Sequence, residues 1–320
     1  MSEPLPDFTV IRPNSVDEAV LALATNPSAR LCAGGTDLIV NMRRGLVQTE
    51  WLIDLSGVSD LKTIFIDDTG IWIGAGVILR DLAQNKAIAA AFPAINIAAL
   101  AIAGPNHRET ATVGGNLCVD TRCLYYNQSH WWRKSNDFCL KYQGEICHVA
   151  PKGNRCRAAY SGDLAPALMV LNAEVSISGA SGQRQIPVAE LFQEDGADYL
   201  TLAPGEIITA VFVPATKAAS TYEKIRVRSA MDFPLAGVAV ASWRTGSDRH
   251  FKLALTGTNS MPLALSPDPL RQGQDADAYF TDLSKQVQKA VSPQRTSTIA
   301  PHYRRLSAAA LAVRLARGML

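Results

Sequence analysis

The stretch AGGTDL, from Ala33 to Leu38, lies between a short apolar segment and a segment with a helical pattern. Two adjacent glycines let the backbone turn sharply and approach a ligand closely, because no Cβ intervenes. Consecutive N–H groups that lead into a helix N-terminus form a site suited to an anion. A plain strand-to-helix turn, capped by Thr36 or Asp37, explains the same residues. The spacing is not GxGxxG, so a Rossmann nucleotide site is not indicated.

A second pair of glycines occurs in TVGGN, from Thr112 to Asn116, after an alanine-rich segment with a helical pattern. A hydroxyl and an amide side chain again flank the glycines. The two turns together favour two loops that hold one ligand with a polyphosphate group. Two unrelated turns remain the alternative.

The pattern of apolar residues around these turns predicts an α+β fold. Residues 7–50 predict strand, helix, strand, turn and helix, and Ser15 is placed as the N-cap of the first helix. A small and polar run at 214–221 predicts a domain boundary. Further strands are predicted at 51–55, 70–76, 170–177, 206–213, 222–228, 237–243 and 251–257, and helices at 79–103 and near the C-terminus.

Composition indicates a globular protein with a sizeable core. Of the 320 residues, 48% are hydrophobic and 19% charged, and the net charge of +2 gives no indication of a nucleic-acid partner. The N-terminal segment lacks the basic region of a signal peptide. The apolar stretch 87–104 is interrupted by Pro93 and Asn96, which favours a buried helix over a membrane span. We therefore expect a cytoplasmic protein, in which structural disulfides are rare.

Four of the six cysteines lie in one aromatic-rich segment from Cys123 to Cys156. Structural zinc sites usually bring their ligands in close C-x(2–4)-C pairs, which this segment lacks. Four thiolates on a long loop can surround a [4Fe–4S] cluster. Unlinked core thiols and disulfides are the alternatives. Cys32 and Cys118 lie outside the segment and are interpreted as small buried hydrophobes.

Two charged residues have simple structural interpretations. Lys224 belongs to a K-x3-R-x3-D pattern that is typical of a solvent-facing strand with alternating charges. A lysine there could also stabilise a reduced, anionic cofactor by its charge. Asp163, in SGDL, is placed to cap a helix.

Four motifs in this order resemble the flavin-binding subunits of the molybdenum hydroxylases, a group that includes the carbon monoxide and xanthine dehydrogenases. They are AGGTDL, TVGGN, SGDLAPALM and YEKIRVRSAMDFPLAGVAV, and the resemblance covers essentially the whole chain. It implies an FAD-binding domain of the vanillyl-alcohol-oxidase (PCMH) type over 1–216, with subdomains 1–57 and 58–216. A small α+β domain like that of the carbon monoxide dehydrogenase flavoprotein would cover 217–320.

The resemblance also implies the cofactor contacts. The turn 31–38 would bind the FAD pyrophosphate through backbone N–H groups, and the turn 112–116 would form a second clamp. Asp163 and Lys224 match polar contacts to the cofactor in the family. The implied FAD-binding residues are Leu31, Cys32, Ala33, Gly34, Gly35, Thr36, Asp37, Leu38, Ile102, Thr112, Val113, Gly114, Gly115, Asn116, Tyr125, Asp163, Ile208 and Lys224.

The cysteine segment departs from most of the family, in which TVGGN is followed closely by the counterpart of SGDL. The insert at 120–160 resembles a loop of the 4-hydroxybenzoyl-CoA reductase β subunits that carries a [4Fe–4S] cluster. The resemblance implies that the cluster ligands are Cys123, Cys139, Cys147 and Cys156.

This resemblance implies an electron-transfer subunit with no catalytic residue of its own. The expected partners are a molybdenum-cofactor large subunit and a [2Fe–2S] small subunit, assembled as a dimer of heterotrimers. Electrons would pass from ferredoxin through [4Fe–4S] and FAD, and 4-hydroxybenzoyl-CoA would be dehydroxylated to benzoyl-CoA. The alternatives are the flavin subunit of an oxidative molybdenum hydroxylase and a self-contained flavin oxidase. No nucleic-acid or membrane partner is expected.

Overall fold

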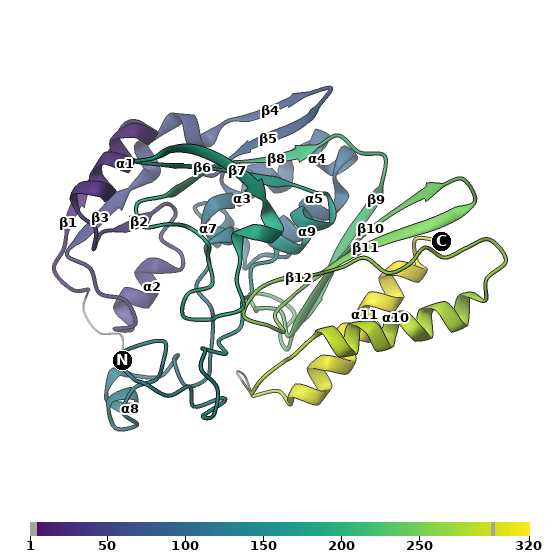
Figure 1. The fold of residues 1–320 in the computed structure, drawn as a ribbon. Coiled ribbons are helices and arrows are strands. Elements are labelled where there is room, and N and C mark those ends of the chain that lie inside the picture. Colours follow the sequence, from purple (N-terminus) through teal and green to yellow (C-terminus); the bar gives the residue numbers. More distant parts are fainter. Residues whose placement is uncertain (1–4, 296–297) are drawn as a thin grey trace.

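The computed structural model describes residues 5–295 and 298–320. Residues 1–4 of the first expected subdomain and 296–297 of the expected C-terminal domain therefore lie outside the described residues. These described residues fold into three sheets with helices packed against them (Figure 1), which confirms the α+β class. Within the described ranges, no helix is long and apolar enough to cross a membrane.

The N-terminal sheet is parallel, with the strand order β1-β3-β2. The expected cap of its first helix is present, because the Ser15 hydroxyl accepts a hydrogen bond from the Glu18 backbone N–H. β2 leads directly into the first glycine turn and then into α2. The bounds are Thr9–Ile11 for β1, Val16–Thr25 for α1, Arg30–Cys32 for β2, Leu38–Arg43 for α2 and Trp51–Asp54 for β3.

The central sheet is antiparallel, with the strand order β4-β5-β8-β6-β7. The short helices that follow β5 pack against it and bury their alanine-rich faces in the largest core. The strands are Ile64–Asp67 (β4), Gly70–Gly74 (β5), Glu174–Gly179 (β6), Gly182–Pro187 (β7) and Ile207–Pro214 (β8). The helices are Leu79–Gln84 (α3), Lys86–Ala91 (α4), Pro93–Ala101 (α5), Pro105–Arg108 (α6), Val113–Leu117 (α7) and Leu164–Val170 (α9).

Part of the strand expected at 170–177 is helical, because α9 continues to Val170 and β6 begins only at Glu174. Every residue of α9 is buried. A helix buried on all sides shows a continuous apolar run that cannot be told from a buried strand by its periodicity. The sequence pattern therefore extended the strand too far toward the N-terminus.

The C-terminal sheet is antiparallel, with the strand order β12-β11-β10-β9. Residues of β10 alternate between two cores, since Ala239 and Ala241 belong to the central core, while Val238 and Val240 pack with α10 and α11. The bounds are Ala219–Ile225 for β9, Ala236–Thr245 for β10, Asp248–Thr256 for β11, Leu263–Leu265 for β12, Ala276–Ala290 for α10 and Pro301–Arg317 for α11.

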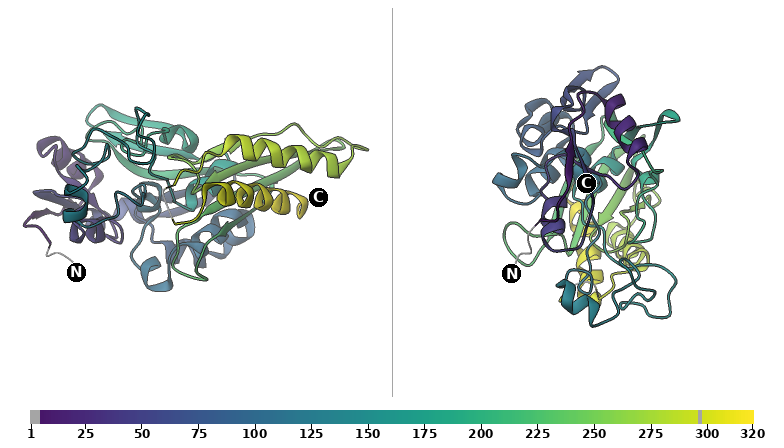
Figure 2. Two further views of the ribbon diagram at one scale, coloured as in Figure 1. Left: turned by 90° about the horizontal axis from the view of Figure 1, so that it is seen from below. Right: turned by 90° about the vertical axis from the view of Figure 1, so that its left-hand side faces the viewer.

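The cysteine segment protrudes from this framework as irregular loops with one short helix, α8 (His130–Lys134). Figure 1 shows these loops below the N-terminal sheet and beside the C-terminal sheet. Figure 2 shows that the molecule is elongated, with the N-terminal sheet at one end and α10 and α11 at the other. The residues just before the segment contact the first glycine turn, because the Asp120 backbone N–H donates to the Asp37 carboxylate.

Candidate functional site

A large cavity lies where the two glycine turns face each other. Its volume is about 1200 Å³, which exceeds the ~300–1,000 Å³ of ordinary small-molecule sites. An extended ligand the size of a dinucleotide therefore fits. The cavity is lined by the whole turn 31–38, by Thr112, Gly115 and Asn116 of the second turn, by the loop after β9, and by part of the cysteine segment.

The first turn touches the backbone just before the second turn. A Cβ built on Gly34 would lie 1.9 Å from the carbonyl oxygen of Thr110, so only glycine permits this contact. Gly35 has φ +67°, in the left-handed region that glycine adopts without strain. The glycines therefore bring one edge of the N-terminal sheet directly against the segment before α7, and the cavity opens beside that contact.

The second turn is held by its own side chains. The Thr112 hydroxyl accepts a hydrogen bond from the Gly115 backbone N–H at 3.1 Å and so caps α7. The Asn116 side chain accepts one from the Leu164 backbone N–H at 3.0 Å and ties the turn to α9. Gly115 lines the cavity, whereas a Cβ on Gly114 would meet the Ala75 side chain at 2.9 Å. Gly115 therefore forms part of the cavity wall, and Gly114 allows close packing against Ala75.

Lys224 is buried, which contradicts the interpretation of a solvent-facing strand. Its side chain is 3% exposed, and its ammonium lies 3.0 Å from Asp163, whose carboxylate also accepts a hydrogen bond from the Tyr222 hydroxyl at 2.5 Å. Asp163 precedes α9 but makes no capping hydrogen bond. Burial raises the pKa of Asp163, and the Lys224 charge opposes that increase. Asp163 and Lys224 both line the cavity.

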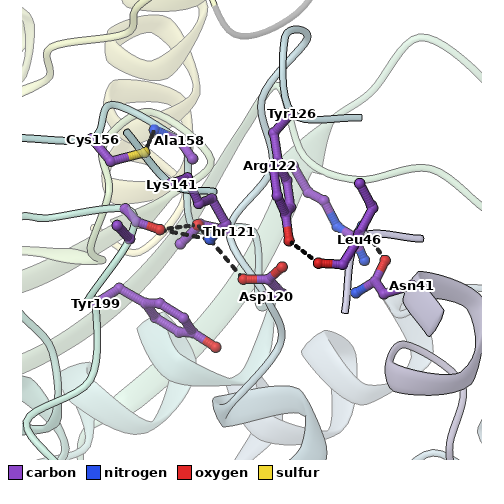
Figure 3. Close-up of polar contacts among 12 residues, drawn as sticks. Asn41, Leu46, Asp120, Thr121, Arg122, Tyr126, Lys141, Cys156, Ala158 and Tyr199 are labelled. Carbon is purple, nitrogen blue, oxygen red and sulfur yellow. Dashed lines mark hydrogen bonds and ion pairs between the residues drawn. The ribbon is translucent and has the colours of Figure 1, made fainter. Parts of the chain in front are cut away.

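Asp37 connects the first turn to the cysteine segment. Its carboxylate forms an ion pair with Arg122 and accepts hydrogen bonds from the Asn41 side chain at 3.2 Å and from the Asp120 backbone N–H at 3.1 Å. Arg122 also donates to Asn41 at 2.9 Å (Figure 3). The sequence does not predict a role for Arg122, because no local pattern indicates a partner 85 residues away.

The four cysteines of the segment line one small cavity. Cys123, Cys139, Cys147 and Cys156 enclose it together with aromatic and apolar neighbours. A hydrogen bond with Cys156 lowers the pKa of Cys147 to about 5 and raises that of Cys156. All six cysteines of the chain are free thiols.

The small cavity is tight. Its volume is about 10 Å³, which is close to the minimum for one water molecule. Among the described residues, no group of three or more histidine, cysteine, aspartate or glutamate side chains is arranged to hold a metal ion. The donor chemistry fits an iron–sulfur cluster, but the thiols would have to move apart to admit one.

Most of the residues implied by the family resemblance line the large cavity. Four do not: Val113, Gly114 and Ile208 belong to the packed framework, and Tyr125 lines the small cysteine cavity. Its neighbour Tyr126 lines both cavities. The implied residues that line the large cavity are Leu31, Cys32, Ala33, Gly34, Gly35, Thr36, Asp37, Leu38, Ile102, Thr112, Gly115, Asn116, Asp163 and Lys224.

The rim of the large cavity exposes apolar side chains. Met231 and Phe233 line it with 57% and 49% of their surface exposed. Val227, on the same loop, is 65% exposed. Exposed apolar groups gathered at a cavity mouth are typical of an interaction surface.

Comparisons with known proteins match most of this chain. Residues 6–216 match a family model described as the FAD binding domain in molybdopterin dehydrogenase. The chain is 32% identical to the FAD-binding subunit of an aldehyde oxidoreductase from Escherichia coli K12, over 86% of this chain and 89% of that protein. It is 24% identical to the medium chain of a glyceraldehyde dehydrogenase from Sulfolobus acidocaldarius, over 94% of each.

A solved structure shows the same fold. A chain of carbon monoxide dehydrogenase from Hydrogenophaga pseudoflava superimposes with a TM-score of 0.77 at 23% identity, over 99% of this chain and 98% of that one. The FAD-binding PCMH-type fold expected from the sequence is therefore confirmed.

The buried pair in the large cavity gives a stability prediction. Asp163→Asn should lower the free energy of unfolding by about 3 kcal/mol, because it leaves the Lys224 charge buried without its partner. Denaturation of the purified chain by urea measures this. The double variant Asp163→Asn/Lys224→Met should recover part of the loss, since both charges are gone.

The control is Glu223→Gln, on the same strand. Its ion pair with Arg314 is exposed, with side-chain exposures of 43% and 61%, so the change should be below about 1 kcal/mol. A double variant as unstable as the sum of its two single variants would contradict the coupling between Asp163 and Lys224.

Proposed function

The chain belongs to the FAD-binding family of the molybdopterin dehydrogenases and is an FAD-binding subunit of a molybdenum hydroxylase-type oxidoreductase; on this premise we propose that it relays electrons through FAD and a [4Fe–4S] cluster. Substrate chemistry would take place on a molybdenum-cofactor partner subunit, with a [2Fe–2S] subunit between the two. The two adjacent cavities, one suited to a dinucleotide and one lined by four thiols, carry this proposal.

The large cavity supplies what FAD requires. The first glycine turn brings its backbone to the wall of the cavity, which suits a pyrophosphate. The N–H groups at the start of α7 are bonded within the protein, so the second turn would contribute close backbone approach at Gly115. Asp163 and Lys224 place an acceptor and a donor in the same cavity. Bound FAD exchanges one or two electrons and so links one-electron and two-electron centres. This chain's residues would bind the cofactor, orient it and keep water away from it.

The small cavity would hold the cluster through Cys123, Cys139, Cys147 and Cys156. Ligation by four thiolates is usual for [4Fe–4S]. A hydrogen bond with Cys156 lowers the pKa of Cys147, whereas burial raises the pKa of Cys123. Ligation by thiolates therefore has to displace the proton of Cys123. Because the thiols enclose so little space without the cluster, we expect cluster binding and loop conformation to be coupled.

The relatives favour the oxidative direction of electron flow. Two of them are named as subunits of an aldehyde oxidoreductase and a glyceraldehyde dehydrogenase. We therefore propose that the molybdenum partner oxidises an aldehyde, and that electrons leave the complex through this subunit to a redox protein such as ferredoxin. The exposed apolar side chains of the loop after β9, namely Met231 and Phe233 at the cavity rim and Val227 nearby in sequence, are the proposed contact with the neighbouring subunit.

A second candidate is the reductive dehydroxylation of 4-hydroxybenzoyl-CoA to benzoyl-CoA. It is favoured by the cysteine segment, which resembles the cluster loop of those reductases. Electrons would then enter from ferredoxin and pass from the cluster to FAD. Both candidates use the same two cavities and differ in the direction of flow and in the substrate of the partner subunit.

The native complex, purified anaerobically, distinguishes these functions. We expect it to reduce an acceptor dye with aldehydes as donors and to contain at least two further subunits. Reduction of 4-hydroxybenzoyl-CoA by reduced viologen, without aldehyde oxidation, would instead establish the second candidate. Substrate turnover by this chain alone would overturn both and indicate a self-contained flavin oxidase.

Retention of FAD tests the large cavity. Gly115→Val should reduce the FAD content of the purified chain at least tenfold, because the side chain would occupy the space beside the cofactor phosphates. Absorbance at 450 nm, compared with protein concentration, measures this. Gly318→Val is the control, since a Cβ there meets no atom closer than 3.5 Å. A Gly115→Val chain with full FAD would show that this turn does not bind the cofactor.

Iron content tests the small cavity. The anaerobically purified chain should hold about four irons. Cys139→Ser should lose most of this iron and retain FAD, because the glycine turns lie outside the cysteine segment. Cys118→Ser, outside the four-cysteine set, should keep both. Zinc in place of iron in the anaerobic protein would contradict the assignment.

A further inference from the structure

The two cavities have a common wall. Of the described residues that line them, Tyr126 and Lys141 belong to both. Tyr126 is 4% exposed, and its hydroxyl donates to the Leu46 carbonyl oxygen at 3.2 Å. The Lys141 ammonium lies 5.1 Å from the centre of the Tyr126 ring. An aromatic ring and a cation therefore separate the four thiols from the large cavity.

Lys141 is held in one position by polar contacts. Its ammonium donates to the Asp120 carboxylate at 2.8 Å, the Thr121 hydroxyl at 2.5 Å and the Gly196 carbonyl oxygen at 2.7 Å (Figure 3). Its side chain is 6% exposed. Three acceptors match the three hydrogens of an ammonium group. The charge is thus fixed and largely shielded from water, so its electrostatic effect on its neighbours is strong.

Other cations of the cysteine segment are placed differently. Lys134 and Lys152 are exposed to solvent. Arg133 is buried and donates to the Gly45 carbonyl oxygen at 2.7 Å, but it lines neither cavity. Asp120 is the ion-pair partner of Lys141, and with 22% exposure it is less buried than the lysine. The negative charge is therefore screened by water more than the positive charge is.

We propose that Lys141 tunes both redox centres, holding one positive charge against the [4Fe–4S] cluster on one side and FAD on the other. The proposal rests on the proposed function, since it needs both groups. A cluster with four thiolate ligands is anionic, and reduction adds negative charge to it. A nearby fixed cation stabilises the reduced form and raises the reduction potential. Because the Lys141 side chain lines both cavities, its charge raises both potentials together and changes the difference between them little.

The test is a potentiometric titration of the native complex. Electron paramagnetic resonance follows the cluster and visible absorbance follows the flavin. Lys141→Met should reduce the equilibrium constant for one-electron reduction of the cluster about tenfold, which is a shift of ~59 mV to lower potential. The flavin potential should fall in the same direction. Lys141→Arg, which keeps the charge, should restore most of both potentials.

Two further variants make the test specific. Asp120→Asn removes the negative partner and should shift both potentials upward. Lys152→Met removes an exposed charge of the same segment and should leave both unchanged. If Lys141→Met loses iron, its potentials cannot be measured. The Asp120→Asn complex then tests the proposal, because it keeps Lys141 and removes only the opposing charge.

Unchanged potentials in a fully loaded Lys141→Met complex would overturn the proposal. Unchanged potentials in Asp120→Asn would also overturn it. A wild-type complex without a cluster signal would instead contradict the proposed function, so the two failures are distinguishable.

Discussion

The direct backbone contact between Gly34 and Thr110 is the constraint on which the rest of the site depends. A Cβ at Gly34 would overlap the Thr110 carbonyl oxygen at 1.9 Å. Without that contact, the N-terminal sheet and the segment before α7 would lie further apart. The two sides of the large cavity would then no longer be held together. The first glycine turn therefore joins the N-terminal sheet to the segment before α7.

The cysteine segment is anchored beside the contact between Gly34 and Thr110. Asp37, at the end of the first turn, pairs with Arg122 and accepts from the Asp120 backbone N–H, so the residues that begin the segment are anchored on the turn itself. Lys141 then bonds to Asp120 and Thr121 and joins the middle of the segment to its start. These links place four thiols on one side of the wall and the FAD cavity on the other.

Local patterns predicted much of the fold and of the large cavity. The glycine turns, the Ser15 cap and the strands with alternating apolar residues all depend on neighbours in sequence. The pair of Lys224 with Asp163, the ion pair of Asp37 with Arg122 and the contacts of Lys141 depend on residues far apart in sequence. Periodicity cannot reveal such pairs, and for Lys224 it indicated an exposed strand position. The family resemblance assigned the four cysteines of the segment as cluster ligands, and the structure adds that they line one cavity.

The most direct test of the account is where iron binds. Anomalous diffraction at the iron edge, from crystals of the anaerobically purified chain, should give one strong peak enclosed by the sulfur atoms of Cys123, Cys139, Cys147 and Cys156. Density for FAD should fill the large cavity on the other side of Lys141 and Tyr126. Absence of an iron peak between the four sulfur atoms, or a disulfide between any two of them, would contradict the account.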